Sequence, residues 1–442
     1  MALEHLSFKG GYHVTDYKEL SNQAALEQGP KPELVRISLH QHIGAPCEPL
    51  VKRKDEVKVG QKIGDSKATI SAPIHSSVSG VVTKIEEVPN NQGGVSKTVI
   101  IESDGKFEKC FETKNNDYTQ MTPEQIIELV REAGIVGLGG AGFPASVKLT
   151  KRRPDQVIDT MIINGAECEP YLTSDQMAME NFPEMVFKGL DIAMRAMGAK
   201  KGYIAVEDNK PKAIEALKAF ESKYENIEIA SLKTKYPQGD MRRLIVAITG
   251  KKLPKSTSAT NEGIQVFNAS TAIGIYQAVV EEKPLYEKIV TVTGNALKKP
   301  KNLMVPIGTS VEELISYCGG FKEEPGKVVI GGPMMGSSQF TLDIPTVKTT
   351  GGIICMTKEE AKPPIVSPCI KCGKCVDVCP VNLMPLYIQQ RALLDHFEEA
   401  NKLGIMDCIE CGTCSYICPS NRPLVEAIIY GKNQIMAQEL SR

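Results

Sequence analysis

Two copies of one cysteine pattern near the carboxyl end constrain this chain more than any other feature of its sequence. Each copy has three cysteines separated by pairs of residues, followed after three more residues by a fourth cysteine and a proline. The copies are CIKCGKCVDVCP at 369–380 and CIECGTCSYICP at 408–419, and they hold eight of the 13 cysteines. Because the total is odd, at least one cysteine cannot have a disulfide partner within the chain. The pattern therefore predicts metal or redox chemistry.

This spacing is typical of a pair of 4Fe-4S clusters, in which three closely spaced thiolates bind one cluster and the fourth cysteine binds the other. Zinc is the alternative, since CxxC pairs also bind zinc, but the third cysteine and the terminal proline favour iron and sulfur. The predicted ligands of the first cluster are Cys369, Cys372, Cys375 and Cys418. Those of the second are Cys408, Cys411, Cys414 and Cys379. Two neighbouring clusters predict one-electron transfer through this region.

Length and charge limit the kinds of protein that this chain can be. A chain of 442 residues is expected to hold several hydrophobic cores in series. The 52 basic and 53 acidic residues give a net charge of −1, so we expect no nucleic-acid partner. No apolar run approaches the length of a membrane span, and the start MALEH lacks a signal-peptide pattern. We expect a chain that does not itself cross a membrane. Docking to a membrane assembly stays open.

Pattern changes divide the chain into four predicted domains of a multidomain α+β protein. Residues 1–115 alternate short apolar stretches with turns, which predicts an all-β module similar to the barrel-sandwich of lipoyl and biotinyl carriers. Residues 116–284 alternate strands and helices as an α/β domain. Residues 285–350 predict a small β-rich domain with one helix, and 351–442 a helical domain around the cysteine runs, with one helix at 385–402. The carriers' modified lysine is replaced here by His75 and Ser76, so no swinging arm is expected.

The segment GLGGAGFP at 137–144 matches GxGxxG, but a helix precedes it and a strand follows. This order disfavours a Rossmann NAD loop. Glycines still allow backbone amides to approach a phosphate, and Lys148 could supply the matching charge. The alternative is a tight structural turn without a ligand.

The segment NGAECEP at 164–170 follows a predicted strand at 160–163. Ligands of α/β domains bind at the carboxyl ends of strands, so its polar groups are candidates for contacts with a flavin or nicotinamide. The alternative is a solvated acidic loop. The five remaining cysteines have no ligand spacing and are expected to be buried or inert: Cys47, Cys110, Cys168, Cys318 and Cys355.

Together these two segments resemble the flavin domain shared by the FMN-carrying subunit of respiratory complex I and the C subunit of the Rnf complex, a membrane ferredoxin:NAD oxidoreductase. FKGGY at 8–12, HIGAP at 42–46, VIGGPMMG at 329–336 and the two cysteine runs are most similar to the Rnf C subunit. The resemblance covers essentially the whole chain. It implies that 116–284 binds FMN and NADH and that 285–350 is a β-grasp domain.

The resemblance also implies which residues form the flavin site. Contacts with FMN would come from Gly137, Gly139, Gly140, Lys148, Asn164, Glu167, Glu207 and Asn268. The residues expected to act on the nicotinamide side are Phe143 and Glu169.

The implied function is an enzyme that exchanges hydride between NAD(H) and FMN and transfers single electrons through two 4Fe-4S clusters. The implied partners are other Rnf subunits, including membrane-embedded ones that couple the reaction to ion transport and a ferredoxin-reactive iron-sulfur subunit. The implied location is peripheral, on the cytoplasmic face of the cell membrane. The alternatives are the cobalamin reductase of propanediol-utilising microcompartments, whose barrel usually follows its other domains, and a non-catalytic two-cluster ferredoxin scaffold.

Overall fold

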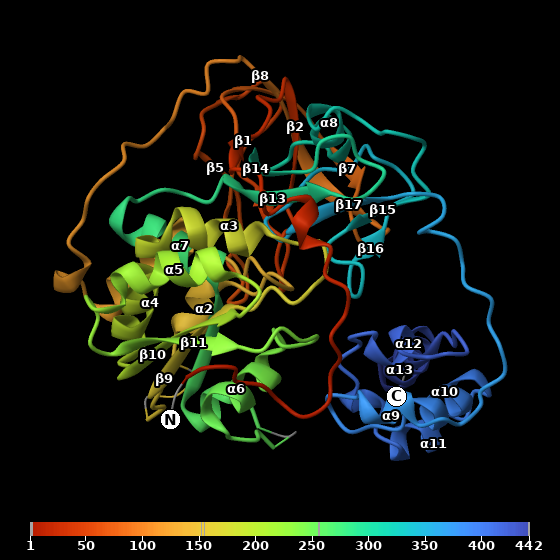
Figure 1. The fold of residues 1–442 in the computed structure, drawn as a ribbon. Coiled ribbons are helices and arrows are strands. Elements are labelled where there is room, and N and C mark those ends of the chain that lie inside the picture. Colours follow the sequence, from red (N-terminus) through yellow and green to blue (C-terminus); the bar gives the residue numbers. More distant parts are fainter. Residues whose placement is uncertain (1–2, 152, 154, 255–256, 441–442) are drawn as a thin grey trace.

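A computed structural model describes residues 3–151, 153, 155–254 and 257–440. Figure 1 shows β structure in the upper half, an α/β part at the lower left, and a helical lobe at the lower right that is joined to the rest by a long extended segment. The chain is therefore a multidomain α+β protein, as predicted.

The barrel is built from strands whose buried side chains come from alternate or consecutive apolar positions. In β2 (Leu34–Ser38), for example, Val35 and Ile37 are buried. One sheet has the order β2-β8-β7-β4 and the other β3-β5-β6. The further strands are β3 (Glu48–Pro49), β4 (Glu56–Val57), β5 (Lys62–Asp65), β6 (Ile74–His75), β7 (Gly80–Pro89) and β8 (Val95–Ser103). His75 and Ser76 are buried, so this turn presents no projecting side chain.

The α/β part is a parallel four-stranded sheet in the order β11-β10-β9-β12. The strands are β9 (Thr160–Gly165), β10 (Lys201–Glu207), β11 (Ile227–Leu232) and β12 (Ile264–Asn268). The large core unites one face of the sheet with α1 (Pro123–Glu132), α2 (Ala145–Leu149), α3 (Ser174–Asn181), α4 (Pro183–Met197), α5 (Pro211–Glu221) and α7 (Ala269–Val280). A second core lies between the other face and α6 (Met241–Thr249), as Figure 1 shows. Helix α1 begins at the capping box of Thr122 and Gln125.

The third part is a six-stranded sheet in the order β1-β14-β13-β17-β15-β16, with helix α8 (Val311–Tyr317) packed against it. Its strands are β1 (Glu27–Gln28), β13 (Glu287–Thr293), β14 (Lys301–Pro306), β15 (Lys327–Ile330), β16 (Ser337–Ser338) and β17 (Gly352–Met356). Two of these strands cross the predicted domain limits, because β1 precedes the barrel and β17 follows residue 350. Strand pairing between distant segments has no local sequence signal, which is why the pattern missed both.

The helical lobe contains short helices around the cysteine runs and a long closing helix. These are α9 (Lys374–Asp377), α10 (Pro385–Leu393), α11 (Phe397–Lys402), α12 (Thr413–Tyr416) and α13 (Leu424–Leu440). The prediction of one helix over 385–402 is wrong. Asp395 adopts a left-handed conformation with φ of 56°, which an α-helix does not accommodate, so the chain breaks between α10 and α11.

Residues 3–28, which we call the N-terminal strap, touch three parts of the molecule. The Leu6 amide donates to the Ser231 carbonyl of β11, and the Gly11 amide donates to the Val378 carbonyl in the helical lobe at 2.8 Å. The strap then contains a 3-10 turn, η1 (Lys18–Leu20), and ends in β1. In Figure 1 it is the red trace that passes between the α/β part and the blue lobe.

Candidate functional site

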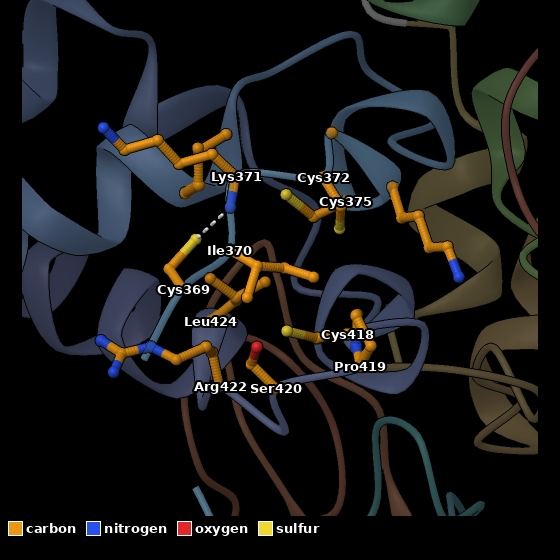
Figure 2. A pocket seen from close by; sticks show the side chains of 13 residues that line it. Cys369, Ile370, Lys371, Cys372, Cys375, Cys418, Pro419, Ser420, Arg422 and Leu424 are labelled. Carbon is orange, nitrogen blue, oxygen red and sulfur yellow. Dashed lines mark hydrogen bonds between the residues drawn. The ribbon is translucent and has the colours of Figure 1, made fainter. Parts of the chain in front are cut away.

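Each cysteine run contributes three sulfurs to one cavity and one sulfur to the other. Figure 2 shows the cavity lined by Cys369, Cys372, Cys375 and Cys418. This cavity has about 350 Å³ of space not filled by protein atoms. We call it the outer cavity. The inner cavity has about 340 Å³ and is lined by Cys379, Cys408, Cys411 and Cys414. The structure thus brings together the two predicted ligand sets, including the exchanged fourth cysteines.

The two runs have the same local conformation. The amides of Lys371 and Glu410 each donate to the sulfur of the first cysteine in their run, both at 3.4 Å. Both residues have a left-handed φ, as do Gly373 and Gly412, which precede α9 and α12. Amide groups directed at sulfur are suited to thiolates that carry negative charge.

The cavities suit a cluster better than a single ion. Among the residues that the structure describes, no three His, Cys, Asp or Glu side chains converge on a point suited to one metal ion. Three sulfurs of each cavity come from one run and the fourth from the other run, which is the ligand pattern of paired cubanes and is not required by tetrahedral zinc. The arrangement therefore disfavours the zinc alternative.

The inner cavity adjoins the α/β part. Cys411 belongs to an apolar cluster with Tyr236 and Val14, and Cys168 and Met334 pack against that cluster. Burial raises the pKa of the Cys408 thiol to about 11. A thiol in these surroundings ionises readily only when a metal replaces its proton.

The polar groups of the α/β part meet at the carboxyl edge of its sheet. Strands β10 and β12 lie on opposite sides of β9, so the strand order reverses there, and ligands of open α/β sheets bind at such a point. Asn164 and Asn268 are register partners across β9 and β12. The Asn164 side-chain amide donates to the Gly239 carbonyl at 2.8 Å, and the Asn268 side chain caps α7 through the Thr271 amide.

The glycine segment lies over this edge. A Cβ on Gly139 would lie 2.2 Å from Asn268 Nδ2 and 3.2 Å from its Cβ, so a side chain there would require the Asn268 side chain to move. Gly142 has a left-handed φ of 75° and is crowded by Thr349, which fits the structural-turn interpretation for that position. Gly140, in contrast, is exposed, and a Cβ there would meet no heavy atom within 4 Å. The Gly137 amide donates to the Phe143 carbonyl at 2.9 Å and closes the loop.

Lys148 lies on α2 and is turned toward β12. Its ammonium donates to the Val266 carbonyl and lies 4.5 Å from the centre of the Phe267 ring. Burial lowers the pKa of Lys148 to about 8. Its charge therefore lies beside the strand that ends in Asn268.

The loop 165–172, which we call the acid loop, is not a solvated surface loop. Glu167 has a φ of 46° and accepts hydrogen bonds from the Asp175 and Gln176 amides at 2.7 and 3.1 Å, which caps α3. Glu169 accepts from the Tyr236 hydroxyl at 3.4 Å and from the Met334 amide at 3.1 Å. Burial raises the pKa of Glu169 to about 7. Glu169 thus connects the acid loop to residues that contact the inner cavity.

Glu207 lies at the carboxyl end of β10, but its carboxylate is buried. Its side chain is 1% exposed and forms an ion pair with Lys210 at 3.2 Å beneath the acid loop. The Lys210 amine also donates to the Ala166 carbonyl at 2.6 Å. Glu207 therefore supports the loop through Lys210 and presents no exposed carboxylate.

Sequence reasoning missed several groups around this site. Lys210 had a weak signal, because it lies three residues after Glu207 at the end of a predicted strand. Asp175, which accepts from Asn268 Nδ2 at 2.5 Å, and Lys18, which contacts the acid loop from the strap, had none. Of the cysteines expected to be buried or inert, Cys110 is exposed because it lies in the extended segment after the barrel.

Family models match four successive parts of the chain. Residues 6–106 match a family model described as RnfC Barrel sandwich hybrid domain, and 130–277 match Nuo51 FMN-binding domain. Residues 289–337 match an SLBB domain and 368–422 a 4Fe-4S dicluster domain. An NAD+-reducing NiFe hydrogenase in the H2-reduced state shares the fold, with a TM-score of 0.52 at 18% identity over 73% of this chain and 63% of that one.

Two curated relatives align along nearly the entire chain. The C subunit of the Na(+)-translocating ferredoxin:NAD(+) oxidoreductase complex of Acetobacterium woodii is 46% identical, with 99% of each chain covered. The proton-translocating counterpart of Clostridium ljungdahlii is 43% identical, with 97% of this chain and 94% of that one covered. Likeness of this extent sets aside the cobalamin-reductase alternative, and the chain belongs to the family of C subunits of the Rnf ferredoxin:NAD+ oxidoreductase complexes.

Proposed function

We propose that this chain is the NAD(H)-reacting electron-transfer subunit of an Rnf-type complex. It is an oxidoreductase subunit with an FMN-binding domain and a domain for two 4Fe-4S clusters. FMN, when bound, exchanges a hydride with NAD(H) and exchanges electrons singly with an iron-sulfur centre. The observation that carries the proposal is the packing of Cys168, which belongs to the acid loop, and of Tyr236 and Met334 against the inner cavity at Cys411.

The proposed cluster ligands are the two sets of four cysteines that line the outer and inner cavities. Their grouping around two cavities, each lined by three cysteines of one run and one of the other, supports this assignment. We also propose the four-domain division near residues 115, 284 and 350, with β1 and β17 assigned to the β-grasp domain.

The proposed flavin site is the carboxyl edge of the sheet, under the glycine segment. Gly137, Gly139 and Gly140 leave the main chain accessible, and the N-terminus of α7 beside Asn268 favours a phosphate. Lys148 adds a positive charge beside β12. Asn164 and Glu167 lie at the carboxyl end of β9, where they hold the Gly239 carbonyl and the start of α3. Glu207 supports the acid loop indirectly, because it pairs with Lys210, whose amine donates to the Ala166 carbonyl.

The proposed nicotinamide side is formed by Phe143 and Glu169. Phe143 is half-buried at the end of the glycine segment, where an aromatic ring can cover a bound nicotinamide. Because burial raises its pKa to about 7, Glu169 can hold or release a proton on its carboxylate near neutral pH.

The surroundings of the cavities support an order for the two clusters. The inner cavity contacts the α/β part, whereas Cys369 and Cys372 of the outer cavity are exposed. The inner cluster would therefore exchange electrons with the flavin, and the outer cluster with a partner.

The partners are other subunits of the complex, as the names of the relatives imply. We propose that they include membrane-embedded subunits, which couple the reaction to ion transport, and a ferredoxin-reactive iron-sulfur subunit. None of the helices in the described ranges combines the length and apolar character needed to cross a bilayer. A peripheral position on the cytoplasmic face of the cell membrane is the proposed location.

The test is anaerobic purification followed by flavin and iron analysis and then mixing with NADH. The expected result is bound FMN, iron for two clusters, and rapid bleaching of the flavin by NADH. A protein with both clusters but no flavin would instead support the ferredoxin-scaffold alternative.

A further inference from the structure

The strap places a buried lysine under the acid loop. Lys18 is 3% exposed and donates to the carbonyl oxygens of Glu167, Glu169 and Leu172 at 2.9, 3.0 and 2.5 Å. These distances join residues about 150 positions apart in the sequence. Lys18 also lies outside residues 130–277, which match the FMN-binding family model.

The hydrogen bonds of Lys18 are complete. An ammonium group has three N–H donors, and each has one carbonyl acceptor here. Lys210 is used in the same way, with the Ala166 carbonyl, the Glu207 carboxylate and the Asn209 side chain as its acceptors. Four carbonyl groups of one short loop are therefore turned inward to two buried amines. Removing either amine would leave buried carbonyls unsatisfied.

The loop needs such support because its backbone is strained. Glu167 and Tyr171 have φ values of 46° and 68°, a left-handed conformation that is unfavourable for residues other than glycine. The strap adds two further contacts at this point. The Tyr171 amide donates to the Asp16 carbonyl at 2.6 Å, and the Tyr17 and Tyr171 rings are stacked with centroids 4.7 Å apart.

We propose that Lys18 is a positioning residue for the reaction with NAD(H). By holding the main chain of the acid loop, Lys18 leaves the side chain of Glu167 to cap α3 and that of Glu169 to reach Tyr236 and Met334. The inference rests on the proposed function for its consequence in catalysis. The structural part of the inference, that the Lys18 amine holds the acid loop, does not depend on the proposed function.

The test compares Lys18→Met with Lys348→Met in the full chain. Lys348 is the matched control, because it is also a buried lysine whose amine donates to two carbonyls, those of Pro73 and Gly134, but it does not touch the acid loop. Hydrogen exchange of the amides of 166–172 and stopped-flow reduction of the flavin by NADH are measured for both. Lys18→Met should raise amide exchange in 166–172 and lower the flavin-reduction rate, each by about tenfold. Lys348→Met should leave both at wild-type values, even if it lowers the melting temperature.

A second variant guards against loss of folding. Lys18→Gln keeps two N–H donors and should give intermediate exchange and an intermediate rate. Wild-type exchange and rate in Lys18→Met would overturn the proposal. So would failure of both Lys18 variants to fold, which would give Lys18 a role in stability alone. If the wild-type protein lacked flavin or did not react with NADH, the proposed function would fall, while the exchange measurement would still decide whether Lys18 holds the loop.

Discussion

The outer and inner cavities share one motif and differ in what surrounds them. Each is lined by four cysteines, and the same amide-to-sulfur hydrogen bond measures 3.4 Å in both. Yet Cys369 and Cys372 are exposed in the outer cavity, whereas Cys411 and Cys414 are buried in the inner one. The motif determines the local geometry, and tertiary packing determines which cavity adjoins the flavin domain. The predictions below test this comparison.

The largest effect is expected from removing an exchanged ligand. Cys379→Ala should abolish the inner cluster, because Cys379 is the fourth ligand of that cluster and the other three come from the second run. The variant should therefore lose about half of the iron. Cys418→Ala is the matched variant and should abolish the outer cluster. Iron analysis and EPR of the reduced protein check this. Loss of the outer cluster in Cys379→Ala would contradict the exchanged assignment.

Blocking the glycine segment should remove the flavin and leave both clusters in place. In Gly139→Val the new side chain would collide with Asn268, since even a Cβ would lie 2.2 Å from its Nδ2 atom. Flavin absorbance should fall by at least about tenfold, with iron content unchanged. The control is Gly94→Val in the barrel, where a Cβ has no neighbour closer than 3.6 Å. Normal flavin content in Gly139→Val would place the cofactor elsewhere.

A smaller effect separates two equivalent isoleucines. Ile370 and Ile409 each follow the first cysteine of their run, but Ile370 is 68% exposed, whereas Ile409 packs against the cluster of Tyr236 and Cys411. Ile409→Ala should cost about 1–2 kcal/mol and Ile370→Ala less than about 0.5 kcal/mol. Thermal unfolding under anaerobic conditions gives the comparison. Equal effects would show that the inner contact contributes little to stability.

The smallest effect concerns pH. Burial raises the pKa of Glu169 from 4.5 to about 7, so between these values the folded chain retains a proton that the unfolded chain has lost. This group's contribution to stability therefore falls as pH rises through that window. Glu169→Gln should reduce the fall in melting temperature between pH 5 and 7, whereas Glu398→Gln, an exposed substitution in the helical lobe, should not. An unchanged pH profile in Glu169→Gln would contradict the shifted pKa.

Local patterns predicted much of this molecule because they encode local physics. The cysteine spacing predicted both ligand sets that the cavities bring together, and Thr122 with Gln125 predicted the start of α1. Contacts between distant segments had no such signal. The pairing of β1 with β14 and the contact of Lys18 with the acid loop both depend on tertiary packing. The break at Asp395 is local, where φ is 56°, but the helical pattern of 385–402 did not indicate it.

The most direct test of the proposed order is reoxidation of the reduced protein by NAD+ in two cluster variants, followed by rapid-freeze EPR. One variant, Cys411→Ser, should lack the inner cluster, and the other, Cys372→Ser, should lack the outer one, with flavin retained in both. Of the two cavities described, the inner one contacts the α/β part. The inner cluster in Cys372→Ser should therefore be reoxidised at the wild-type rate. The outer cluster in Cys411→Ser should stay reduced. Reoxidation of that outer cluster at the wild-type rate would contradict the order of flavin, inner cluster, outer cluster and partner.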